Sequence, residues 1–192
     1  MRGIRKILLL ALFFLIPGSF LFAQEISDPE ELFDEGEFFF LAEEYEEALY
    51  YYQTLLQHDS DNANFNFKLG NTYINIPGQE FRAIPYLEKA ILNTSIKYKN
   101  RSYKEKRAPH YAYYTLGDAY RMNNELHKAL NIYQIFTESD DFEGNYNLDI
   151  VEAKIKACER AKIIQDVPIN ASFSKLDSPI NTNTNNDVNC YS

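Results

Sequence analysis

The feature that most restricts the fold of this chain is a short pattern that returns at fixed helical positions. In its clearest copy a Leu-Gly pair and a tyrosine are followed nine residues later by an alanine. The two clearest copies are Leu116, Gly117, Tyr120 and Ala129, and, earlier in the chain, Leu69, Gly70, Tyr73 and Ala83. A glycine and an alanine in this order allow two helices to cross closely. The pattern therefore predicts a row of helical hairpins, each of which buries its apolar face against its neighbour.

The first hairpin lies in an acidic run, because the residues from Gln24 to Asp61 include thirteen acidic residues and no lysine or arginine. Aromatic and aliphatic residues recur through this run at helical spacing. Two amphipathic helices are expected, with a turn at residues 42–45 and the acids on the solvated faces. Asp28 and Pro29 are typical of a helix start, since aspartate caps the first turn and proline is tolerated there.

Two more hairpins are expected, at residues 63–92 and 110–137, and a single helix at residues 147–165 is expected to cap the row. Between the hairpins, residues 96–107 carry six basic residues, one acid and two tyrosines. We call this segment the basic loop. It is expected to be solvated and attracted to the acidic first hairpin, with an acidic partner or an anionic polymer as the alternative.

The two ends of the chain differ from this helical part. Residues 1–23 have three basic residues ahead of an apolar run and end at Ala23, which predicts a secretory signal peptide. The run is too short for a retained membrane anchor, so no transmembrane segment is expected after cleavage. Residues 167–192 are polar and rich in asparagine, which predicts an extended tail. The helical domain is therefore assigned to residues 24–166.

The repeated pattern resembles the tetratricopeptide repeat, a hairpin motif of about 34 residues with a Leu-Gly pair on its first helix. The starts of the first two copies, Pro29 and Ala63, are separated by this period. In the first copy Glu35 replaces the usual leucine, which suits an end unit. The resemblance implies an all-α solenoid of three repeats and a C-terminal capping helix.

In proteins of this family, the first helices of the repeats line a concave groove that holds a peptide. The phasing of the copies places an aromatic column beside a polar column along this groove. The partner-binding candidates implied by the resemblance are Phe33, Glu37 and Phe40, then Phe67, Asn71 and Ile74, then Tyr114, Asp118 and Arg121. The capping helix and the tail are alternative occupants of the groove. A chaperone-type carboxylate clamp is not expected, because an aromatic and an acidic residue occupy two of its positions.

A narrower resemblance links residues 24–187 to the N-terminal region of large Bacteroidetes envelope proteins. It rests on the acidic first hairpin, on residues 70–78 and 83–90, and on the basic loop. Those proteins continue into a WD-type β-propeller and an OmpA-like domain, and some serve type IX secretion or gliding. The resemblance implies a periplasmic or outer-membrane-associated scaffold for an envelope protein. The alternative is a front end whose repeats dock on its own propeller, with the tail as the start of that propeller.

Other classes of function find little support in the sequence. Removal of the three basic residues of the signal peptide takes the formal net charge from −9 to −12, which disfavours nucleic acid as a ligand. His58, His110 and His127 lie at helix ends or turns without metal-ligand spacing, and no catalytic constellation is apparent. No enzyme activity, metal, cofactor or small-molecule substrate is therefore expected. Cys158 is expected to be a small apolar residue on a helix, with a disulfide to Cys190 as the alternative.

Overall fold

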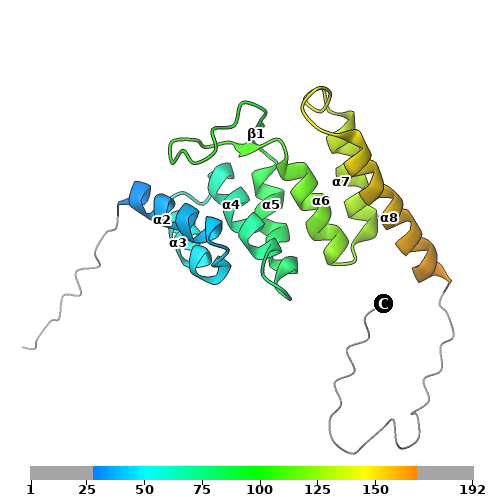
Figure 1. Ribbon diagram of the computed structural model, residues 1–192, viewed down its shortest axis with the longest axis horizontal. Helices are drawn as coiled ribbons and strands as arrows, with labels where there is room; N and C mark the ends of the chain where they lie inside the picture. Colours follow the sequence, from blue (N-terminus) through cyan, green and yellow to red (C-terminus); the bar gives the residue numbers. More distant parts are fainter. Residues whose placement is uncertain (1–27, 168–192) are drawn as a thin grey trace, which may run out of the picture.

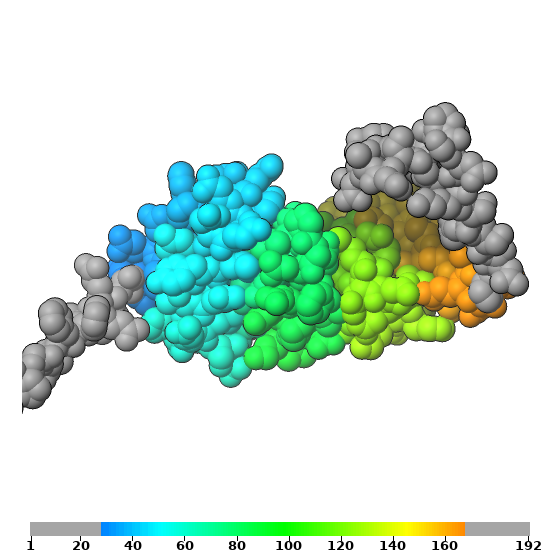
Figure 2. All heavy atoms as spheres, turned by 90° about the horizontal axis from the view of Figure 1, so that it is seen from below, coloured from blue at the N-terminus to red at the C-terminus, as the bar shows by residue number. Residues whose placement is uncertain are grey.

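The computed structural model describes residues 28–167, which form seven α-helices arranged in a row (Figure 1). The predicted signal peptide and all but the first residue of the predicted tail lie outside this part of the chain. The space-filling view in Figure 2 shows the helices in contact along the length of the molecule, in the order of the sequence. This arrangement is the expected all-α solenoid.

The helices form three hairpins and one final helix. The first hairpin is α2 (Pro29–Leu41) with α3 (Tyr45–His58), and the second is α4 (Ala63–Ile74) with the 3₁₀ turn η2 (Glu80–Ala83) and α5 (Ile84–Ala90). The third hairpin is α6 (Ala112–Met122) with α7 (Leu126–Glu138), and α8 (Leu148–Asp166) packs against α7. In Figure 1, α2 and α3 lie at one end of the row and α8 lies at the other.

Local capping interactions fix several helix starts, and the sequence predicts the one at Asp28. The side chain of Asp28 accepts a hydrogen bond of 3.1 Å from the backbone N–H of Glu30, at the start of α2. Asn62 caps α4 in the same way through the N–H of Phe65, at 3.2 Å. Such caps satisfy backbone donors that have no partner within the helix. The helix boundaries in this part of the chain are therefore set by neighbouring residues.

In each hairpin the two helices approach closely at a glycine of the first helix, which lies against a large side chain of the second helix. A Cβ atom added at these glycines would lie 2.9 Å from Tyr52 at Gly36, 2.6 Å from Leu87 at Gly70 and 2.4 Å from Tyr133 at Gly117. The close approach confirms the predicted role of the glycines. The nearest side chain is a ring or a leucine and not the predicted alanine, although at Gly70 the carbonyl oxygen of Ala83 also lies 3.3 Å from the added Cβ atom. Ala48, Ala83 and Ala129 are nevertheless fully buried.

The basic loop has a defined conformation that is held by interactions within the loop and between its two ends. A short parallel bridge between β1 (Thr94–Ser95) and β2 (Ala108–Pro109) joins its two ends, which the sequence did not predict. At its centre the buried carboxylate of Glu105 accepts hydrogen bonds of 2.7 and 2.8 Å from the guanidinium of Arg107. The backbone N–H groups of Arg107 and Lys99 also donate to it. These bonds, led by that of Arg107, lower the pKa of Glu105 to about 2.

The structure of α8 differs somewhat from its predicted buried face, which leaves Lys154 outside and consists of Leu148, Val151, Ile155, Cys158 and Ala161. Val151 and Cys158 are buried, as expected, whereas Leu148 is 47% exposed. Lys154, expected outside this face, reaches a carboxylate on α6. The pairing of Cys158 with Cys190 falls outside the described residues. None of the helices in residues 28–167 combines the length and apolarity needed to cross a membrane.

Candidate functional site

The nine residues predicted to line the groove all lie on the first helices of the hairpins, α2, α4 and α6. Their exposure divides them into two groups. Phe33, Glu37 and Phe67 are buried, with exposed fractions of 0%, 7% and 7%. The other six are partly exposed, namely Phe40, Asn71, Ile74, Tyr114, Asp118 and Arg121. The predicted aromatic column is therefore not a continuous open surface, because two of its three rings are covered.

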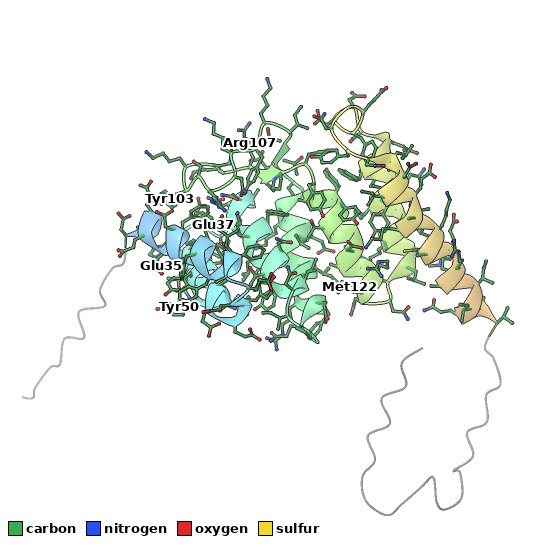
Figure 3. All side chains as sticks on the ribbon, in the orientation of Figure 1. Glu35, Glu37, Tyr50, Tyr103, Arg107 and Met122 are labelled. Atoms are coloured by element: carbon green, nitrogen blue, oxygen red, sulfur yellow. The ribbon has the colours of Figure 1, made fainter. Side chains whose placement is uncertain are left out.

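The cover over the first two repeats is the basic loop. The ring of Tyr103 packs against Phe33 and Phe65, with centroid distances of 6.3 and 6.0 Å. The ring of Tyr98 lies 6.4 Å from that of Phe67. Figure 3 labels Tyr103 and Arg107 on this loop and Glu37 on the neighbouring helix α2. The sequence considered the capping helix and the tail as occupants of the groove, whereas the loop is the segment that covers this half.

Glu37 is held in a buried ion pair beneath this cover. Its carboxylate lies 2.7 Å from the ammonium group of Lys68, and the hydroxyl of Tyr52 donates to it at 2.6 Å. Lys68 also donates to the side chain of Asn100 on the loop, at 3.0 Å. Burial lowers the pKa of Lys68, and the charge of Glu37 opposes this shift. Glu37 therefore joins two repeats and the loop, and its carboxylate is already occupied.

A small polar pocket remains at the edge of the covered half. Phe40, Leu41 and Asn71 line it from the helices, and Asn100 and Arg101 line it from the basic loop. Its volume is about 280 Å³. The exposed guanidinium at its rim gives this pocket a polar, cationic character.

The polar residues of the third repeat are also paired. The carboxylate of Asp118 accepts hydrogen bonds from Tyr133 at 2.8 Å, from Lys154 at 3.0 Å and from Arg121 at 3.2 Å. The ammonium group of Lys154 also lies 5.7 Å from the ring centre of Tyr114. One lysine of α8 thus reaches both the polar and the aromatic column of this repeat. The capping helix α8, one of the two alternative occupants of the groove, therefore reaches it in this repeat through the side chain of Lys154.

Beside this lysine, the third repeat keeps an open pocket lined mainly by aromatic rings, which we call the aromatic pocket. Its volume is about 170 Å³, and its lining residues are Tyr111, Tyr114, Phe136, Tyr146, Asn147, Ile150 and Val151. Tyr111 stacks on Tyr114 with a centroid distance of 5.0 Å and is 42% exposed. Burial of the phenol, followed by the effects of Tyr114 and Asp118, raises the pKa of Tyr111 to about 12. The pocket therefore offers neutral rings to an apolar or aromatic side chain.

The sequence missed most of this pocket. Tyr111 lies one helical turn before Tyr114, so helical spacing alone could have added it. Tyr146 and Ile150 come from the segment around the start of α8, and no local pattern relates them to α6. Their place depends on how α8 packs against α7.

Neither a metal nor a catalytic group is apparent in the described part of the chain. Between residues 28 and 167 no cluster of three or more histidine, cysteine or acidic side chains is suited to a metal ion. His110 is buried among Tyr113, Phe136 and Tyr146, and its Nε2 lies 2.8 Å from the hydroxyl of Ser139. Burial lowers its pKa. His110 is therefore part of the packing beneath the aromatic pocket.

Comparison with known proteins supports this fold. The family model of the TPR repeat matches residues 36–76. Among solved structures, the first TPR of Spaghetti (RPAP3) bound to the HSP90 peptide SRMEEVD is 21% identical, with a TM-score of 0.52, over 70% of this chain and 95% of that one. No curated protein matches the chain.

Two further structures agree. The Sgt2 TPR domain from Aspergillus fumigatus is 18% identical, with a TM-score of 0.54, over 78% of this chain and 89% of that one. The protein MamA is 22% identical, with a TM-score of 0.54, over 72% of this chain and 66% of that one. The chain therefore has the all-α TPR solenoid fold that its repeats predict.

Proposed function

We propose that this protein is a periplasmic interaction scaffold that holds a segment of an envelope partner in its concave groove, chiefly at the aromatic pocket. The observation that carries this proposal is the open pocket of rings at the third repeat, where the same surface of the first two repeats is covered. A similar fold holds a peptide in the first TPR of Spaghetti. Repeat solenoids in general bind partners on such concave surfaces.

The pocket favours a segment with a large apolar or aromatic side chain. Tyr111 and Ile150 stand at its mouth, with exposed fractions of 42% and 55%. Asn147 supplies an amide at the same place, and Lys154 lies close to Tyr114. An apolar anchor would fill the space between the rings, and polar groups of the partner would contact the rim. We therefore expect one anchoring side chain and not an extended acidic tail.

The location and the partner class rest on the sequence. The predicted signal peptide directs export, and the resemblance to Bacteroidetes envelope proteins supports a partner in the envelope. The alternative function is that the groove holds a β-propeller of the same polypeptide, as in the front end of those envelope proteins. The resemblance favours this alternative through the order of the acidic hairpin, the second repeat and the basic loop.

Capture of partners from an envelope extract tests the proposal. Tyr111→Ala combined with Ile150→Ala empties the mouth of the pocket while both side chains are partly exposed, so helicity by circular dichroism should be unchanged. We expect this variant to lose the captured protein. The matched control is Phe81→Ala, which removes a ring that is 52% exposed outside the pocket and should leave capture unchanged.

Unchanged capture by the double variant would overturn the groove proposal. Mass spectrometry of the captured material separates the two functions. A separate envelope protein supports the scaffold, and a propeller-bearing product of the same reading frame supports the alternative.

A further inference from the structure

Four aromatic rings form a continuous row across the first hairpin, which we call the aromatic ladder. Phe38 contacts Phe39, Phe39 stacks on Tyr51, and Tyr51 contacts Tyr50, with centroid distances of 5.4, 5.4 and 5.3 Å. The two ends of the ladder are open to solvent, because Phe38 is 63% exposed and Tyr50 is 65% exposed. The two inner rings, Phe39 and Tyr51, are partly buried, and a contiguous patch of rings marks an interaction site more often than single exposed residues do.

The ladder lies outside the groove, at the end of the solenoid away from α8. Figure 1 places α2 and α3 at this end, and Figure 3 labels Glu35 and Tyr50 there. Helical spacing places Phe38 and Glu35 on the side of α2 opposite to Phe33 and Phe40. A partner on the ladder therefore does not compete with one in the aromatic pocket.

The surface around the ladder is acidic and largely unpaired. Among the acids of the first hairpin, only Glu37 and Asp59 form ion pairs within residues 28–167. Glu35 precedes Phe38 and Phe39 by one turn, and Glu47 precedes Tyr50 and Tyr51 by one turn, so these carboxylates border the rings. The hairpin itself supplies no lysine or arginine.

Elsewhere in the molecule, rings and carboxylates in this combination hold a lysine. Three ammonium groups lie both near an acidic oxygen and near a ring centre. Lys68 lies 2.7 Å from the carboxylate of Glu37 and 5.9 Å from the ring centre of Phe33. Lys128 lies 2.6 Å from Glu125 and 5.0 Å from the ring centre of Tyr120. Lys154 lies 3.0 Å from Asp118 and 5.7 Å from the ring centre of Tyr114. The ladder has both the rings and the acids, and the cation is absent from the described residues around it.

We propose that the aromatic ladder and its bordering carboxylates bind the lysine or arginine side chains of a basic segment of a partner polypeptide. The rings attract the cations through their faces, and the carboxylates add charge and hydrogen bonds. The acidic hairpin also steers such a segment toward this end. A second copy of this chain fits less well, because each copy has a negative net charge, −9 with residues 1–23 and −12 without them, and two copies therefore repel.

Peptide binding measured by fluorescence anisotropy tests this proposal. The probe is a short labelled peptide of alternating lysine and leucine, and its control carries glutamate in place of every lysine. The double variant Phe38→Ala with Tyr50→Ala changes no charge and removes exposed rings. We expect it to bind the lysine probe roughly tenfold more weakly, from the loss of two exposed cation–π contacts. Phe81→Ala, which removes an exposed ring outside both the ladder and the aromatic pocket, should bind as the wild type does.

A second pair of variants tests the contribution of the carboxylates that border the ladder. Glu35→Gln with Glu47→Gln should weaken binding and flatten its dependence on salt, because fewer charges are screened. Asp140→Asn with Asp141→Asn removes the same charge in the turn before α8 and should leave the affinity unchanged.

Equal binding by the ladder variant and the wild type would overturn the proposal, as would equal binding of the glutamate peptide. Loss of binding in Tyr111→Ala alone would assign the probe to the groove. Self-association in sedimentation velocity that disappears in the ladder variant would assign the ladder to a second copy. None of these results depends on capture by the aromatic pocket.

Discussion

The two halves of the concave groove have the same repeat positions and opposite exposure. In the first two repeats, Phe33 and Phe67 lie beneath Tyr103 and Tyr98 of the basic loop. In the third repeat, the equivalent Tyr114 lines an open pocket. The difference shows that the repeat decides which way a side chain points, whereas an insertion decides whether that side chain meets solvent.

The largest effect is expected from a change that destroys the open half. Gly117→Leu places a side chain where even a Cβ atom would lie 2.4 Å from Tyr133, so α6 and α7 cannot keep their distance. We expect a loss of about 3 kcal/mol in the free energy of unfolding, because an overpacked core must shift its backbone. Thermal melting by circular dichroism measures this loss.

The control for this variant is Asn131→Leu, which adds the same side chain at an exposed position of α7. It should melt as the wild type does. A cooperative transition at the wild-type temperature for Gly117→Leu would contradict the repeat phasing itself.

A smaller effect is expected from opening the covered half. Tyr103→Ala removes the ring that packs on Phe33 and Phe65, with an expected cost of about 2 kcal/mol for a half-buried aromatic side chain. The same substitution at Tyr111, in the open half, should cost less, because that ring is 42% exposed. Urea denaturation compares the two variants, and equal costs would remove the distinction between the halves.

A third effect concerns the hydrogen bonds that hold the basic loop, and it depends on pH. The pKa of Glu105 is lowered from 4.5 to about 2 in the folded protein, chiefly by Arg107. Its contribution to stability is therefore complete above pH 4.5 and is lost as the pH falls through 2. Glu105→Gln should lower stability at pH 7 and show a smaller further loss between pH 4.5 and 2.

Hydrogen exchange locates this change within the molecule. In Glu105→Gln, the amides of the basic loop should exchange faster, while those of α7 and α8 keep their protection. The exposed acid Glu143 provides a control, since Glu143→Gln should leave both regions unchanged. Equal protection of the loop in Glu105→Gln and the wild type would show that the loop does not depend on this carboxylate.

The fold could be predicted from the sequence because its signals are local. Asp28 and Asn62 cap helices two or three residues away, and each Leu-Gly pair lies within a single helix. For the candidate site, the sequence could predict only which face of the first helices lines the groove. The burial of Phe33 requires Tyr103, which lies far along the chain, and the engagement of Asp118 requires the direction in which α8 packs. Tyr111 is the one missed residue that helical spacing alone could have supplied.

Hydroxyl-radical footprinting of the unmodified protein tests the division of the groove most directly, because it reports the solvent exposure of individual side chains. We expect rapid oxidation of Tyr111 and Ile150, slow oxidation of Phe33 and Phe67, and protection of Tyr111 when a captured partner is added. Oxidation of Phe33 and Phe67 at the rate of Tyr111 would contradict this expectation, since the basic loop would then not cover the first half of the groove.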